Sequence, residues 1–401
     1  MTPTSLAPKV AVLFDNFGPY HLARLKAAAK QFRLLAIEQR LQSQEYLWQV
    51  SEDVPFNRVF VLDGKDTDIS RSTEQALLIE KLNEFEPDVV VIPGWASRQA
   101  VTGLAWAKAN RVPAVVMSDS QEIDSTRSSW SEWLKSRVVG LCSAGLVGGT
   151  PHKAYLEKLG MPTECIRKGY DVVDNGYFSE HSELAKSKSF ALRPKHSLPE
   201  RYFLASNRFI PKKNLRRLLE AYADYAARSD DAAWGLVMLG DGALKSELMA
   251  QVDRLGLSTH VQFPGFKQYD ELPIYYALAS VFIQASTSEQ WGLVVNEAMA
   301  SGLPVLVSDR CGCAPDLVKN GVNGWTFDPF DTQQLTELMH SIAHGNTDLL
   351  AMGAASREII QHWSPQTFAA SMGEAVSAAL NANKPPFKII DKVLLWLLMH
   401  R

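Results

Sequence analysis

The sequence is 401 residues long, which is more than one domain of ordinary size holds and suits two. Apolar residues make up 46% and charged residues 21%, as in soluble globular proteins, and the net charge of −3 lacks the basic excess of a general nucleic-acid binder. Residues 1–8 hold no basic segment followed by a long apolar run, and no apolar run approaches the ~20 residues of a membrane-spanning helix. A cytoplasmic protein without nucleic-acid partners is therefore expected.

Short β-branched runs alternate with helical patterns in the first half of the chain. The runs that read as strands cover residues 10–14, 34–37, 59–62, 89–92, 114–117 and 141–147, with helical patterns such as 20–32 and 72–85 between them. Short continuous apolar runs separated by helices are typical of a parallel sheet that is covered on both faces. They predict an α/β domain over residues 1–178.

A polar stretch and a second α/β series follow. Residues 179–200 are rich in Lys and Ser and contain Pro194 and Pro199, which predicts a linker. Residues 201–362 then repeat the strand and helix alternation, with strand-like runs at 203–205, 235–239, 261–263, 281–283 and 304–307. Ligands bind beyond the carboxyl ends of such strands, so two doubly wound domains predict a site in a central cleft that both domains face.

The strongest motif is a loop over residues 286–293, which follows the strand-like run 281–283 and leads into a helical pattern. The N-terminus of a helix favours a phosphate, and Gly292 would let a ligand approach the backbone. Glu289 and Glu297 stand eight positions apart and could accept hydrogen bonds from two hydroxyls of one ligand. The alternative is a capping acid and an ordinary helix glutamate.

A basic segment over residues 207–215 follows the first strand of the second domain. Arg208 and Lys213 could neutralise a diphosphate, the first as a planar fork and the second as a point charge. The alternative is a solvated basic turn, which is the interpretation that fits Lys212.

Two further turns close neighbouring strands. The turn Gly240-Asp241-Gly242 separates a strand from a helix, and the segment 263–266 ends the next strand. Each is weak alone, because turns between strands and helices often use glycine.

In this order and spacing, the motifs resemble the donor half of glycosyltransferase family 4, a family with the two-domain GT-B fold that retains anomeric configuration. The likeness is close over about residues 202–330, and the first half is similar in architecture alone. The resemblance implies that Glu297 binds ribose hydroxyls. It further implies a catalytic set in which Glu289 contacts the donor sugar while Arg208 and Lys213 hold the diphosphate. The other donor-binding positions that it implies are Gly240, Asp241, Gly242, Phe266, Gly292, Leu293 and Val294.

The first domain offers fewer matched positions. Gly18, in the loop after the first strand, fits the place where the family has a glycine near the donor phosphates. Candidate acceptor contacts are His21, Trp95 and Asp119, each with a structural alternative: a structural histidine, a core aromatic and a helix cap. Many family members have a histidine where this sequence has Ser118 and Asp119.

Residues 363–401 are predicted to form helices that return toward the first domain. In the last of them, Ile389, Val393 and Leu397 share one face. This helix could dock on the first domain, which is the favoured fate of an amphipathic helix, or lie on a membrane surface. The residues that suit the membrane alternative are Lys384, Lys388, Lys392 and Trp396.

The predicted reaction is transfer of a sugar from a nucleotide-diphosphate sugar to a hydroxyl of a glycan or lipid-linked acceptor, in glycan, polysaccharide or glycolipid synthesis. No metal or other cofactor is expected, because GT-B enzymes generally need none. Asp66 and Asp68 are therefore interpreted as part of a solvated turn. Two alternatives remain open: a sugar-nucleotide epimerase or hydrolase with the GT-B fold, and a non-catalytic nucleotide-sugar sensor. A dinucleotide dehydrogenase is less favoured, because neither domain opens with a Gly-x-Gly-x-x-Gly turn.

Overall fold

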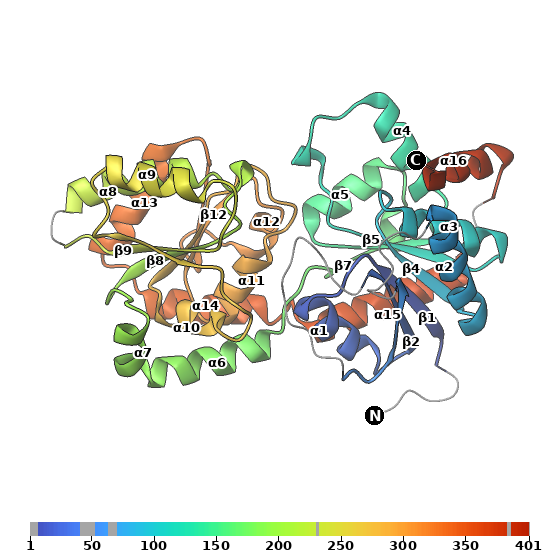
Figure 1. The fold of residues 1–401 in the computed structure, drawn as a ribbon, viewed down its shortest axis with the longest axis horizontal. Helices are drawn as coiled ribbons and strands as arrows, with labels where there is room; N and C mark the ends of the chain where they lie inside the picture. The colour runs from blue at the N-terminus through green and yellow to red at the C-terminus, as the bar shows by residue number, and fades with distance from the viewer. Residues whose placement is uncertain (1–6, 41–52, 63–69, 230–231, 383–385, 401) are drawn as a thin grey trace. The chain divides into compact units, whose positions relative to one another are not determined.

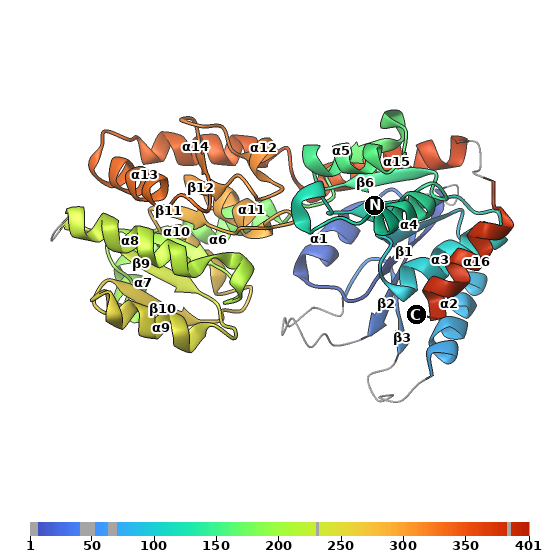
Figure 2. The same ribbon diagram turned by 90° about the horizontal axis from the view of Figure 1, so that it is seen from above.

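The computed structural model describes residues 7–40, 53–62, 70–229, 232–382 and 386–400. By its internal contacts the chain divides into two compact units, Met1–Val172 with Ser364–Arg401, and Val173–Trp363. Each unit is a parallel sheet with helices on both faces (Figures 1 and 2). Both units are therefore doubly wound and Rossmann-like, which confirms the predicted fold class of each.

The first unit contains a seven-stranded sheet with the order β3-β2-β1-β4-β5-β6-β7, in which every neighbouring pair is parallel. The core of this sheet is the apolar runs of β1 and β4, which are buried because helices cover both faces. The strand bounds are β1 Lys9–Phe14, β2 Arg33–Arg40, β3 Asn57–Leu62, β4 Val89–Pro93, β5 Ala114–Ser118, β6 Ala144–Val147 and β7 Ile166–Lys168. Strand β7 was not predicted, because its three residues carry one apolar side chain.

The second unit contains a six-stranded parallel sheet with the order β10-β9-β8-β11-β12-β13. Its strands are β8 Tyr202–Ser206, β9 Gly235–Leu239, β10 Val261–Gly265, β11 Val281–Gln284, β12 Val305–Ser308 and β13 Gly324–Phe327. Strand β13, at the sheet edge, was also missed, because Gly-Trp-Thr-Phe lacks a β-branched apolar run. The five strands that were predicted here are all present.

The strand order reverses once in each sheet, between β1 and β4 in the first and between β8 and β11 in the second. At such a switch point the connections leave on opposite faces, which opens a crevice beyond the carboxyl ends of the two central strands. The loops after β8 and β11 are therefore neighbours, although about 80 residues separate them in the sequence.

Helices complete the layers of each unit. The first unit has α1 Pro19–Ala28, α2 Arg71–Phe85, α3 Arg98–Ala109, α4 Ser129–Val139, α5 Thr150–Lys158, α15 Pro365–Asn381 and α16 Ile389–His400. The second unit has α6 Asn175–Ser187, α7 Ser189–Lys195, α8 Leu215–Ser229, α9 Lys245–Arg254, α10 Leu272–Leu278, α11 Leu293–Ala300, α12 Ala314–Leu317, α13 Thr332–His344 and α14 Leu349–Ile360.

The segment 179–200 differs from the predicted linker. Most of it lies in α6 and α7, and the division between the units falls earlier, after Val172. Helix α6 is capped by Asp174 and buries Phe178, Ser182 and Ala185, which fall on one helical face. Its composition is polar because the opposite face is solvated, so few apolar residues are enough to dock it.

The C-terminal segment packs within the first unit. Helix α15 lies against α1 and the sheet, and α16 lies against α3. The docked side of α16 is Leu394 and Leu395 together with Asp391, whose carboxylate pairs with Arg137 of α4. Among the described residues, no helix combines the length and hydropathy that crossing a bilayer would require.

Candidate functional site

The centre of the site is an ion pair between Lys213 and Glu289. Lys213 closes the 3-10 turn Pro211–Lys213 after β8, and Glu289 lies in the loop after β11. The Lys213 ammonium contacts Glu289 Oε2, and the two side chains are only 12% and 13% exposed. The switch point thus brings together two of the three predicted catalytic residues. An ion pair that is largely shielded from water is electrostatically stronger than one on the surface.

Two further polar side chains hold the same carboxylate, and neither was predicted from the sequence. Gln284 ends β11 and is fully buried; its Nε2 donates to Glu289 Oε2 at 3.2 Å and to Ser286 Oγ at 3.0 Å. Ser286 Oγ donates to Glu289 Oε2 at 3.3 Å. The available signal was a glutamine at the end of an otherwise apolar strand, since a buried amide needs partners.

Backbone hydrogen bonds anchor the Glu289 loop on both sides. Thr287 N donates to the carbonyl of Lys212 at 2.9 Å, which ties the loop to the turn after β8. On the other side, Glu289 N donates to Arg310 O at 3.3 Å, and Gly312 N donates to Glu289 O at 3.0 Å. The acid is therefore held in place before any ligand arrives, which is a requirement of electrostatic catalysis.

Gly292 forms the N-cap of α11 with φ +105°, a conformation that favours glycine. Leu293 and Val294 follow as the first turn of the helix and are half-buried. Trp291 turns inward instead, and its Nε1 donates to Asn296 Oδ1 at 2.8 Å. A Cβ on Gly292 would stand 3.5 Å from Glu289 Cγ, so the start of α11 lies close to the Glu289 side chain.

Glu297 lies inside the second unit with 0% of its surface exposed. The hydroxyl of Tyr276 donates to Glu297 Oε2 at 2.5 Å, and burial together with the nearby carboxylate raises the pKa of Tyr276 and of Tyr269. A ribose contact to this carboxylate requires the side chains around it to move. Its implied role stays a prediction.

The predicted glycine turn packs against the Arg208 loop. A Cβ on Gly240, where φ is +123°, would stand 1.8 Å from the carbonyl oxygen of Asn207, and one on Gly242 would stand 2.8 Å from the backbone of Phe209. Phe209 N donates to Asp241 O at 2.8 Å in the same contact. The glycines thus let two strand-end loops stack and so position Arg208.

The remaining predicted donor positions are exposed. Arg208 projects from the loop between two buried neighbours, and Phe266, 43% exposed, follows β10. Asp241 pairs with Lys245 at 2.7 Å, and this ion pair holds the pKa of Asp241 below its usual value. Asp241 therefore interacts with a lysine of its own turn in this structure.

In the first unit, Gly18 is the N-cap of α1, and His21 completes the cap. The backbone N–H of Gly18 donates to His21 Nδ1 at 3.1 Å, while that of Phe17 donates to Glu38 Oε2 at 2.7 Å. These N–H groups are therefore engaged within the protein. Burial, with a smaller effect of Arg24, lowers the pKa of His21 to about 3, so the ring is neutral and acts as a cap.

This capping predicts a specific loss of stability in acid. Above pH ~6.5 the ring is neutral in both the folded and the unfolded chain; below it, only the unfolded chain takes up the proton. His21 should therefore cost about 2 kcal/mol of stability at pH ~5, roughly 1.5 units below its ordinary pKa. Urea unfolding at pH ~7.5 and ~5 should show that His21→Gln, which keeps an acceptor, loses less stability than the parent. Identical losses would contradict the burial of a neutral imidazole.

The surroundings of the two other acceptor candidates, Trp95 and Asp119, bear on their structural alternatives. Trp95 packs against the core of the first unit, edge-on to Tyr155 at 6.3 Å, and also lines a groove of about 420 Å³. Asp119 follows β5, and its charge contributes to the raised pKa values of Asp124 and Asp171. It is not the cap of the next helical turn, because that N-cap is Gln121.

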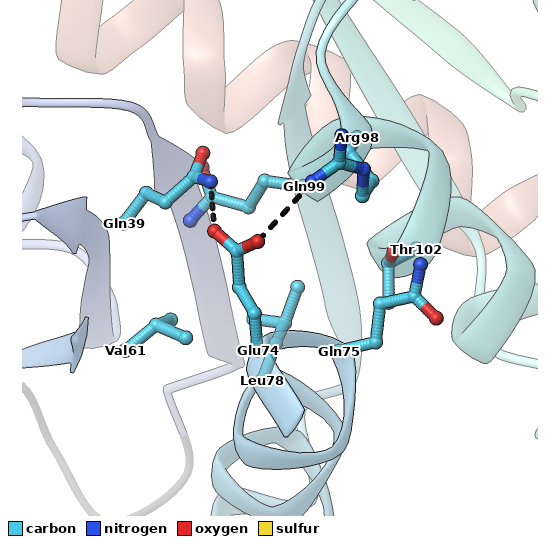
Figure 3. Close-up of a pocket in the computed structure, with 8 residues that line it drawn as sticks. All are labelled: Gln39, Val61, Glu74, Gln75, Leu78, Arg98, Gln99 and Thr102. Atoms are coloured by element: carbon cyan, nitrogen blue, oxygen red, sulfur yellow. Dashed lines mark hydrogen bonds and ion pairs between the residues drawn. The ribbon is translucent and has the colours of Figure 1, made fainter. Parts of the chain in front are cut away.

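A cavity in the first unit is too small for a sugar (Figure 3). Glu74 links the side chains of Gln39 and Arg98, while Gln99 Oε1 and Thr102 Oγ1 are buried without a hydrogen-bond partner. The space of about 10 Å³ is near the size of one water. Residues 66 and 68, the aspartates of the predicted solvated turn, lie outside the described residues.

Comparison with known proteins identifies the architecture of the chain and a family model that matches most of the second unit. HepE of Anabaena, solved in complex with UDP and glucose, superposes on this chain with a TM-score of 0.72 and 20% sequence identity. The superposition covers 92% of this chain and 99% of the HepE chain. The chain therefore has the GT-B fold. The family model "Glycosyl transferases group 1" matches residues 189–359, which confirms the resemblance of this segment to glycosyltransferases and is consistent with family 4.

Curated relatives match parts of the chain. A GDP-mannose-dependent alpha-(1-6)-phosphatidylinositol monomannoside mannosyltransferase of Mycobacterium tuberculosis is 31% identical over 46% of this chain and 49% of its own length. An alpha-monoglucosyldiacylglycerol synthase of Acholeplasma laidlawii is 26% identical over 70% of this chain and 71% of its own. The chain spans about half the length of the mannosyltransferase that it matches.

Proposed function

We propose that this protein is a retaining glycosyltransferase that moves a sugar from a nucleotide-diphosphate donor to a hydroxyl of a glycan or lipid-linked acceptor. The observation that carries the proposal is the Lys213–Glu289 pair, which lies at the switch point of the second unit, within the segment that matches the family model of the group 1 glycosyl transferases. The names of the two relatives, both enzymes that glycosylate lipids, support a lipid-linked acceptor.

In this reaction the bond from the anomeric carbon to the diphosphate oxygen breaks, and the acceptor oxygen bonds to the same carbon on the same face. The acceptor proton passes to the departing diphosphate, so no protein base is required. Lys213 and Arg208 would stabilise the charge that develops on the diphosphate. Lys213 would do so through an ammonium that is largely shielded from water, and Arg208 through its planar guanidinium. Glu289, held by Gln284 and Ser286, would orient the donor sugar.

Donor binding is the first expected outcome. A sugar nucleotide at about 100 times its Kd adds about 2.7 kcal/mol to the free energy of unfolding, which should raise Tm by roughly 5–10 °C. A thermal-shift panel that includes GDP-mannose and UDP-glucose should contain one donor with this effect. The shift should shrink in Lys213→Ala, which removes the ammonium that pairs with Glu289, and persist in Lys212→Ala, which removes the lysine at the preceding position.

Product analysis then separates the functions. Release of free sugar in the absence of any acceptor would indicate a hydrolase, and binding without turnover would indicate a sensor. If no sugar nucleotide stabilises the protein, the proposed donor site is wrong.

A further inference from the structure

Helix α16 presents a second apolar side besides the one that docks on the first unit. Ile389, Ile390, Val393, Trp396 and Leu397 are 51–80% exposed, and we call these five residues the α16 face. They recur at intervals of three and four residues, so they form one stripe along the helix. Single exposed apolar residues are common, but five on one helix need an explanation.

The exposed charged residues of the segment 388–400 are two lysines. Lys388 and Lys392 are exposed beside the α16 face, and the one acid of the helix, Asp391, is buried and paired with Arg137. The protein as a whole carries a net charge of −3, so this local excess runs against the average. Two exposed lysines beside an apolar stripe complement an anionic surface that has an apolar interior.

The neighbouring helix α4 adds exposed aromatic area. Trp130 and Trp133 are 67% and 40% exposed, and their rings stack with centroids 5.0 Å apart. Helices α4 and α16 lie side by side, joined by the Arg137–Asp391 ion pair (Figure 2). Tryptophan suits the boundary between headgroups and acyl chains, because its ring is apolar and its N–H can still find a polar partner.

We propose that the α16 face binds the surface of an anionic lipid bilayer, with the helix lying in the plane of the membrane. Twelve residues are too few to cross a bilayer but enough to bury one apolar stripe at its surface. A second copy of the chain is a poorer occupant, because a twofold interface through this face would bring Lys388 and Lys392 near their own equivalents. The inference does not depend on the proposed transferase activity.

Vesicle sedimentation tests the proposal on the full-length chain without any substrate. The protein should bind vesicles of phosphatidylcholine with about 30% phosphatidylglycerol and bind pure phosphatidylcholine much less. Replacing the stripe in Val393→Ser/Trp396→Ser/Leu397→Ser should lower the partition coefficient at least tenfold. Lys388→Gln/Lys392→Gln should lower it by about fivefold for each lysine, and about 1 M salt should have a similar effect.

The control is Phe190→Ser/Leu350→Ser, which removes two apolar side chains that are 95% and 87% exposed in the second unit. It should bind vesicles like the parent, and circular dichroism and Tm should show that all variants fold. Vesicle binding that survives the triple serine variant overturns the proposal. So does a parent that ignores anionic vesicles but forms a dimer, detected by light scattering, that the triple variant loses.

Discussion

Glu289→Ala is expected to lower kcat/KM by about 10²–10³ while leaving the fold intact. The substitution removes the carboxylate that would orient the donor sugar. It also leaves Lys213 without its ion-pair partner at a site where the two side chains are only 12% and 13% exposed. Lys213→Ala should lower kcat/KM by a similar factor, because it removes a positive charge that would stabilise the departing diphosphate. Steady-state assays with the donor identified in the binding panel measure both effects.

The matched controls are Lys212→Ala, adjacent to Lys213, and Glu358→Ala on an exposed turn of α14. Both should keep turnover near that of the parent. The double variant Lys213→Ala/Glu289→Ala should lose less than the product of the single losses, because the two residues act as one unit. If Glu289→Ala and Lys213→Ala turn over like the parent, the assignment of the site is wrong.

Gly240→Ala is expected to reduce the free energy of unfolding by at least about 3 kcal/mol. The backbone of Gly240 has φ +123°, and an added Cβ would stand 1.8 Å from the carbonyl oxygen of Asn207. That oxygen belongs to backbone and cannot rotate away, so the loops after β8 and β9 would have to separate. In a unit of this size, such a loss should lower Tm by roughly 10 °C in calorimetry.

Gly256→Ala separates strain from steric overlap. Gly256 also has a positive φ, +71°, but a Cβ there would meet nothing within 4 Å. Gly256→Ala should therefore reduce the free energy of unfolding by about 1 kcal/mol. Equal losses at the two positions would show that the contact between the two loops is not tight in solution.

Much of the architecture could be predicted because the signals are local. The apolar runs of β1, β4, β8 and β11 are continuous because both faces of each sheet are covered. Edge strands β7 and β13 were missed because each is short and pairs with a neighbouring strand on one side alone, and such strands carry little of the continuous apolar run. The segment 179–200 was misinterpreted for a related reason: α6 docks through a few residues, and composition averages over both of its faces.

The sequence by itself determined the two α/β series, the order of the donor motifs and the presence of Glu289, Arg208 and Lys213, because strand periodicity and motif spacing are written along the chain. The tertiary structure alone decided which of these groups meet. It paired Glu289 with Lys213 through the switch point, placed Gln284 behind them and enclosed Glu297 beside Tyr276. Such contacts join residues that lie far apart in sequence, and burial and pairing depend on the packing of whole elements, which no local pattern encodes.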